Sequence, residues 1–262
     1  MIVVTGATGH IGSELVRLLS AKDASVRAVT RDTRKAQSTP RVTWVKGDLR
    51  HVQSLPDLFR GAEEMFLLTS NSEAMRTLQV NALEAANMAG VTHVVKLSAL
   101  GASDHSKSPI GKAHHDVERV LQSSGMAWTI LRPHVFMQNF LDAAPIIARE
   151  RRIRSASGDG KIPFVDTRDI AAVAAVALTE HGHHGKKYVL TGPEALSYGD
   201  VARTIAEVTG EPVDYVAESI EEVGKRLVRA RTPLWMIEGM LALAAYQRAE
   251  GPPPRSPLPF PR

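Results

Sequence analysis

The sequence predicts an α/β protein built on a doubly wound parallel sheet, with a smaller lobe towards its C-terminus. Apolar segments of strand length alternate with segments of helical spacing through the first half of the chain, the order expected of βαβ units. The apolar segments are nearly continuous, which is typical of strands buried on both faces. The first of them, over residues 2–4, leads straight into a glycine-rich turn and a helix.

This turn has the spacing G-x-x-G-x-x-G, formed by Gly6, Gly9 and Gly12. Such glycines allow a turn with positive φ, a close approach of pyrophosphate to the backbone, and tight packing of helix on strand. The N–H groups and the positive dipole end of the following helix then face the phosphates. The motif predicts a Rossmann-type dinucleotide site; a glycine-rich βα turn without a ligand is the alternative.

Arg31 follows the second predicted strand, over 25–30, about 20 residues after the glycine turn. An NAD site usually places an acidic residue there, whereas an arginine there can hold the 2′-phosphate of NADP(H). Arg31 therefore favours NADP(H), and Arg34 can share the phosphate. The neighbouring Asp32 leaves NAD(H) possible, and a solvated basic turn is the alternative.

Three further strands, predicted over 42–45, 64–68 and 93–97, also end in small or polar residues. Ligands of doubly wound sheets bind beyond the carboxyl ends of the strands, so these residues are expected to line the cofactor from adenine to nicotinamide. Alternatively, Asp48 stabilises a turn, and the polar residues after the strand over 64–68 cap the next helix. The expected contacts are Asp48, Leu49, Thr69, Ser70, Asn71, Ser98 and Ala99.

Composition limits the class of protein and its partners. The 262 residues carry a formal net charge of +4, and their Lys and Arg are scattered, which is poor evidence for nucleic acid. The chain has no cysteine, which excludes disulfides and thiolate metal sites. No apolar run is long enough to span a bilayer, and the first strand begins almost at residue 1. We expect a cytoplasmic protein with a small-molecule substrate and neither nucleic-acid nor membrane partners.

The predicted division of the chain follows a sixth strand over 128–131. Pro133 is expected to force the chain out of the sheet. Residues 1–132 then form the NADP(H)-binding domain, which also receives a strand near 187–191. Residues 133–250 form a second, smaller lobe with helices near 169–179, 198–208 and 219–229, and residues 251–262 form a Pro-rich tail, extended or disordered.

Several of these segments together resemble the NmrA-like group of atypical short-chain dehydrogenases/reductases. The likeness is closest to type-2 NADPH:quinone oxidoreductases and triphenylmethane reductases. It implies that the glycine loop, Arg31, residues 69–71 and the loop after the sixth strand contact NADP(H). It also implies that the lobe over 133–250 binds the substrate, over the nicotinamide. The segments that carry it are 5–12, Arg31, 108–111, 124–133, 136–139, 164–171 and 190–193. The cofactor contacts that it adds are Thr8, His10, Ile11, Pro133, Val135, Phe136 and Gln138.

The chain departs from the wider superfamily in its proton donor. Ordinary members use a Tyr-x-x-x-Lys pair, but no tyrosine here has a lysine four residues later, and Ser108 occupies the tyrosine position before Lys112. The departure favours hydride transfer to an electron-poor acceptor, such as a quinone, enone or dye, whose reduced anion collects a proton from water. Lys112, His114 and His134 are the candidate catalytic groups; polar residues on an exposed helix turn are the alternative.

Other functions remain open or are disfavoured. A redox-sensing regulator that binds NADP(H) without turnover is the alternative of a different class. The His181–His184 tract lacks ligands at metal spacing, so no metal is expected. The basic run 149–154 is interpreted as the charged C-terminal end of a helix, and it lacks interleaved aromatic residues, so no nucleic acid is expected. The apolar helix over 234–243 can roof the pocket, pair two subunits as a homodimer, or pack on the lobe.

Overall fold

The core of the protein is a seven-stranded parallel sheet in the order β3-β2-β1-β4-β5-β6-β8. The computed structural model describes residues 1–249, so the predicted tail over 251–262 lies outside the described residues. The order reverses between β1 and β4, where doubly wound sheets bind their ligands. The predicted fold class is confirmed. The strands are β1 (Ile2–Val4), β2 (Val26–Thr30), β3 (Val42–Lys46), β4 (Glu64–Leu67), β5 (His93–Leu97), β6 (Ala127–Pro133) and β8 (Lys186–Leu190).

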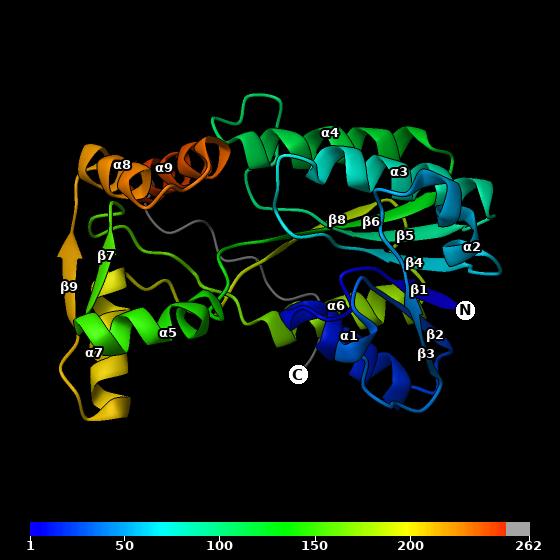
Figure 1. Cartoon of the computed structure of the whole chain (residues 1–262), viewed down its shortest axis with the longest axis horizontal. Helices are drawn as coiled ribbons and strands as arrows, with labels where there is room; N and C mark the ends of the chain where they lie inside the picture. Colours follow the sequence, from blue (N-terminus) through cyan, green and yellow to red (C-terminus); the bar gives the residue numbers. More distant parts are fainter. Residues whose placement is uncertain (250–262) are drawn as a thin grey trace.

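Helices cover both faces of this sheet (Figure 1). On one face α1 (His10–Ala21) packs beside α6 (Thr167–Thr179) and buries an apolar layer that includes Leu15 and Ile170. On the other face lie α2 (Leu55–Phe59), α3 (Met75–Met88) and α4 (Pro109–Ser123). Their layer includes Phe59, Leu83 and Leu121. The short helices η1 (Thr33–Lys35) and η2 (Val52–Ser54) follow β2 and β3.

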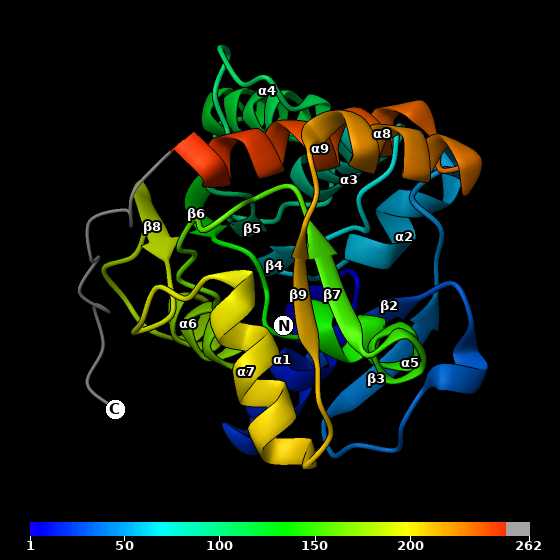
Figure 2. The same ribbon diagram turned by 90° about the vertical axis from the view of Figure 1, so that its left-hand side faces the viewer.

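The remaining elements form a smaller lobe beyond the carboxyl ends of the strands (Figure 1). Its two-stranded parallel sheet pairs β7 with β9, between α7 and α5 in Figure 2. Rings of Phe140, Phe164 and Tyr198 meet edge to face at 5.2 to 5.9 Å in the lobe core. The elements are α5 (Asn139–Glu150), β7 (Arg152–Ser155), α7 (Tyr198–Thr209), β9 (Asp214–Ala217), α8 (Ile220–Arg229) and α9 (Leu234–Ala249).

The structure corrects the expected lobe in three places. Residues 152–155 and 214–217 form strands, although the first was interpreted as the charged end of a helix. Helix α6 packs on the sheet beside α1 rather than in the lobe. Strand β6 continues to Pro133, because a fixed φ of about −65° is compatible with extended backbone and the Pro133 carbonyl still accepts from Leu100 N.

Helix α9 contains the predicted apolar segment and continues beyond it. It packs against α8 and touches the N-terminal part of α4, which joins the lobe to the sheet. Ile110 of α4 lies 3.0 Å from the position that a Cβ of Gly239 would occupy. None of the helices within residues 1–249 is long and apolar enough to cross a membrane.

Candidate cofactor and active site

The glycine loop joins β1 to α1 beside the point where the strand order reverses. Gly6 has φ +66°, and a Cβ there would lie 2.9 Å from Leu68 O. A Cβ on Gly12 would lie 2.2 Å from Gly6 O, which is impossible without moving the backbone. The protein's own packing therefore requires glycine at both positions.

Gly9 is different, because the protein itself leaves room for a side chain there. Its backbone is extended, with φ −87°, and a Cβ would make only an ordinary 3.5 Å contact. Gly9 is the N-cap of α1, and no side chain caps this helix end. The exposed Gly9 and the uncapped first-turn amides together form a cradle that fits a diphosphate.

Two residues tie this loop to its surroundings. The Thr5 hydroxyl lies 2.9 Å from both the backbone N and the O of Leu68, which holds the ends of β1 and β4 together. His10 Nε2 lies 3.2 Å from Asp142 Oδ1 on α5, so the loop also contacts the lobe. Of the predicted contacts, Thr8 and His10 are exposed, and Ile11 is buried against the sheet.

A positively charged pocket lies at the ends of β2 and β3. Its volume is about 290 Å³, and its positively charged side chains are those of Arg31 and Lys46. Arg31 makes no ion pair within the described residues, so its guanidinium remains available to an anion. The pocket lining is Arg31, Lys46, Gly47, Asp48, His51 and Ser54.

The acidic residues near this pocket are held by arginines of their own. Asp32 accepts from Arg34 Nε at 2.9 Å and Nη2 at 3.0 Å, and this contact lowers the pKa of Asp32. Asp48 accepts from Arg50 Nη2 at 2.5 Å, which likewise lowers its pKa. Each acid stays ionised but compensated, so the excess positive charge of the pocket comes from Arg31 and Lys46. Leu49, also predicted here, is buried in the core.

At the end of β4, Thr69 is held by a side chain that the sequence did not single out. Its Oγ1 accepts from Nε2 of Gln79, which is completely buried, at 2.8 Å. Ser70 and Asn71 follow and are exposed at the carboxyl edge of the sheet. These positions suit contact with a ligand in the crevice.

The loop after β6 is fastened to the start of α6. Gln138 Nε2 donates to Asp166 Oδ1 at 2.9 Å, and its Oε1 accepts from Thr167 N at 3.0 Å. Hydrogen bonds from Arg168 lower the pKa of Asp166 to about 2. Gln138 thus fixes the loop that also contains Val135 and Phe136, both half-buried, above the edge of the sheet.

The three predicted catalytic side chains have different environments. Lys112 points to solvent from α4. His114 is buried on the inner face of the same helix, with Nδ1 3.0 Å from Lys96 Nζ. His134 is buried just after β6, where its Nδ1 accepts from Val135 N at 2.8 Å.

Helix α4 also shows what the residue at the position of the missing tyrosine does. Ser108 caps α4 through Gly111 N, so its hydroxyl serves the helix end. In the first turn of α4, Ile110 packs against Gly239 of the lobe, and His114, four residues after it, contacts Lys96 of the sheet. Burial raises the pKa of Tyr198 to about 12, so this tyrosine keeps its proton within the lobe core.

A buried acid lies under the end of β5. Glu118, 1% exposed, accepts from Ser98 Oγ at 2.5 Å and from Arg132 Nη2 at 2.6 Å, and Lys187 Nζ lies 3.3 Å away. Although burial opposes it, these hydrogen bonds lower the pKa of Glu118. The Ser98 hydroxyl is thereby used as a donor inside the protein. Ala99, next to it, is half-buried at the crevice.

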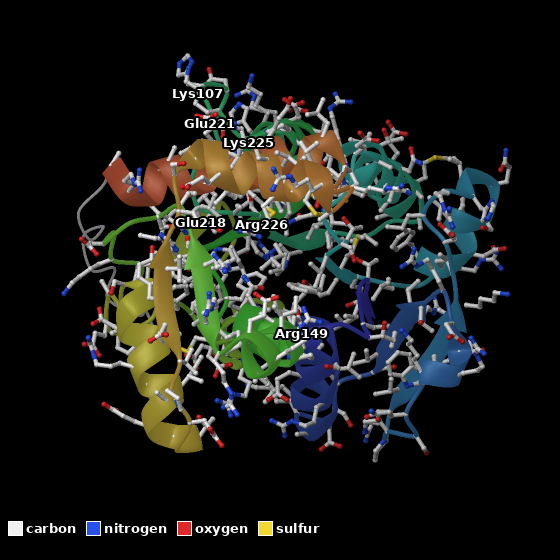
Figure 3. The ribbon with its side chains drawn as sticks, turned by 60° about the vertical axis from the view of Figure 1, so that its left-hand side comes forward. Lys107, Arg149, Glu218, Glu221, Lys225 and Arg226 are labelled. Carbon is white, nitrogen blue, oxygen red and sulfur yellow. The ribbon has the colours of Figure 1, made fainter. Side chains whose placement is uncertain are left out.

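Charged residues also gather on the far lobe, around a pocket of about 380 Å³ between β9 and α8. Glu218, just after β9, lies there between Arg154, 3.3 Å away, and Arg226 of α8, 2.7 Å away; Figure 3 labels Glu218 and Arg226. These ion pairs join β7, β9 and α8. Within residues 1–249, no group of His, Cys, Asp and Glu could hold a metal ion.

Several known proteins are similar to this chain in sequence and in fold. The NAD(P)H azoreductase of Xenophilus azovorans is 37% identical over 247 residues, covering 94% of this chain and 86% of that protein. An NADPH-dependent quinone oxidoreductase of Escherichia coli, solved with NADPH, superposes with a TM-score of 0.84 at 29% identity over 96% of this chain and 90% of the other. The triphenylmethane reductase of Citrobacter sp., solved with NADP(H), gives a TM-score of 0.82 at 25% identity over 95% and 90%. The NmrA-like family matches residues 1–251, so this chain belongs to the NmrA-like family, and these relatives are NAD(P)H-dependent reductases.

Proposed function

We propose that this protein is an NADPH-dependent reductase that delivers hydride to a small electron-poor acceptor such as a quinone, an enone or a dye. The observation that carries the proposal is the pairing of an uncapped helix N-terminus behind Gly9 with the cationic pocket at Arg31. The two sites flank the carboxyl ends of β1 to β3, so a diphosphate and a 2′-phosphate of one nucleotide can each meet positive charge. The reductases among the relatives support the same reaction class.

The chain's own residues bind and orient, and the bound nucleotide supplies the hydride from C4 of its nicotinamide. The glycine loop and Arg31 hold the phosphates, while Thr69 and the loop from Pro133 to Gln138 border the crevice. His10 and Asp142 link loop and lobe across it. No tyrosine–lysine pair is needed, because the reduced acceptor is a stabilised anion that collects its proton from water.

The cofactor preference is tested at Arg31. We expect Arg31→Ala to weaken NADPH binding by about tenfold or more, since a charge-assisted contact with the 2′-phosphate is lost. NADH binding should change less than about twofold, because NADH has no such phosphate. Titration calorimetry with both nucleotides measures this difference. Arg60→Ala, which removes an exposed arginine paired with Asp57, serves as the matched control. An equal loss for both nucleotides would refute the role of Arg31.

The reaction itself is tested by following NADPH absorbance with a panel of quinones, enones, azo dyes and triarylmethane dyes. Reduction of at least one class supports the reductase. Tight NADPH binding with no acceptor reduced would instead favour the regulator that senses the nucleotide. NAD(H) remains a possible second cofactor, and the same assay with NADH measures it.

A further inference from the structure

Lys96 is completely buried near the carboxyl end of β5, an inner strand of the sheet. Buried lysines are rare because an ammonium loses its hydration on leaving water. Lys96 Nζ donates to Leu97 O at 3.1 Å and lies 3.0 Å from His114 Nδ1. The proposed binding of NADPH does not use this lysine, so the presence of a buried lysine here needs another explanation.

Two other charged groups act on Lys96: Glu118, one turn beyond His114 on α4, and Arg132 of β6. Lys187 of β8 lies 3.3 Å from Glu118. Burial lowers the pKa of Lys96 to about 7, against the opposing attraction of Glu118. Lys96 is therefore an ammonium below neutral pH.

The contact with Lys96 decides which nitrogen of His114 carries the proton. An ammonium has no lone pair, so His114 Nδ1 must accept from it and the ring proton resides on Nε2. Burial, with the positive charges of Lys96 and Arg132, holds the pKa of His114 well below its usual range, so the ring is neutral. Nε2 makes no hydrogen bond to any described residue.

His114 contacts the penultimate residue of β5, near the strand end beyond which doubly wound sheets bind their ligands. It follows Ile110 by one helical turn on the inner face of α4, and Ile110 packs against Gly239 of the lobe. The neutral imidazole thus lies near the carboxyl end of β5, one helical turn from the contact of α4 with the lobe.

We propose that Lys96 is a positioning residue for His114: it fixes the imidazole as the Nε2–H tautomer, which donates a hydrogen bond to the acceptor atom on which negative charge develops. The proposal rests on the reductase function proposed above. A neutral histidine can act as such an electrophile because its N–H is aimed before the charge appears. His114 then stabilises the reduced acceptor and gives up no proton, which still comes from water.

The first test observes the tautomer directly. Protein labelled with ¹⁵N-histidine is examined by NMR at about pH 6, where Lys96 is charged and His114 neutral, following from the lowered pKa of each. We expect His114 Nδ1 to be unprotonated and Nε2 protonated. In Lys96→Met the two nitrogen signals should move towards a mixture of tautomers. Lys186→Met, which removes an exposed lysine from β8, should leave them unchanged.

The second test is a double-mutant cycle with 1,4-naphthoquinone as the acceptor. We expect Lys96→Met to lower kcat by about tenfold, with the Kd for NADPH changed less than about twofold. In a His114→Gln background Lys96→Met should cause no further loss, because Lys96 acts through the imidazole.

Two results would overturn the proposal. One is an Nδ1–H tautomer in the unmodified protein, a measurement that needs no variant to fold. The other is the same loss of kcat from Lys96→Met with and without His114. If the unmodified protein binds NADPH but reduces no acceptor, the reductase function fails, and the NMR spectrum alone still decides the Lys96–His114 pairing.

Discussion

Gly12→Ala should destabilise the fold by about 3 kcal/mol or more, whereas Gly9→Ala should fold normally and lose the nucleotide. The two positions differ in the space that the protein itself leaves for a methyl group. A methyl group on residue 12 would overlap Gly6 O at 2.2 Å, and only the backbone can move to relieve it. A methyl group on residue 9 meets nothing closer than 3.5 Å.

For Gly9→Ala we expect a change in unfolding free energy within about 1 kcal/mol, the size of an N-cap effect. Its affinity for NADPH should fall by about a hundredfold, because the methyl group would occupy the space that a pyrophosphate needs to reach the helix amides. Urea unfolding and titration calorimetry give the two quantities separately. The matched control is Gly224→Ala on α8, where a Cβ has only an ordinary 3.5 Å contact. Wild-type affinity for NADPH in Gly9→Ala would show that the diphosphate does not bind at this loop.

The sheet was predictable because its signals are local. Each central strand is a short apolar run followed by small or polar residues, and a parallel sheet buried on both faces needs little more than that pattern. The strands β7 and β9 escaped prediction for the opposite reason. The segment Arg152–Ser155 has only one apolar residue, Ile153, and its partner Asp214–Ala217 lies far along the chain. Pairing at such a distance leaves no periodicity to recognise.

The candidate site was predictable where backbone geometry dictates the residue type. Gly6 and Gly12 are required by close contacts, and Arg31 follows from its distance along the chain to the glycine loop. The partners of charged side chains were not predictable. Whether Asp32 faces a ribose or its neighbour Arg34 depends on rotamers, which the sequence does not determine.

Lys96 was missed although it gave a signal. The strand His93–Leu97 is buried along its whole length, so a lysine in it must find polar partners inside the protein. Its partner His114 was a candidate, but as one of several polar residues at a helix start. The contact between the two depends on how α4 packs on β5, a property of the tertiary structure.

Lys96 should also make the stability of the protein depend on pH. Burial lowers the pKa of Lys96 from 10.5 to about 7, so between these values the unfolded chain binds a proton that the folded chain has released. Stability rises with pH wherever the unfolded state binds more protons. The unfolding free energy should therefore increase with pH above about pH 7, by roughly 1.4 kcal/mol per pH unit from this one group. Below about pH 7 both states hold the proton and the contribution is constant.

The comparison with Lys96→Met isolates this contribution, because all other ionisable groups are common to both proteins. From about pH 7.5 to about pH 9.5, the unfolding free energy of the unmodified protein should rise by roughly 2 to 3 kcal/mol relative to the variant, measured by urea unfolding. Glu118 stays ionised over this range because its pKa is lowered, so it adds no slope. Lys186→Met, at an exposed position of β8, should differ from the unmodified protein by an amount independent of pH. A flat difference for Lys96→Met as well would mean that Lys96 keeps its proton in the folded state. The ammonium would then be stabilised by Glu118 and His114 far more strongly than its burial disfavours it, and the tautomer of His114 would be fixed over the whole range.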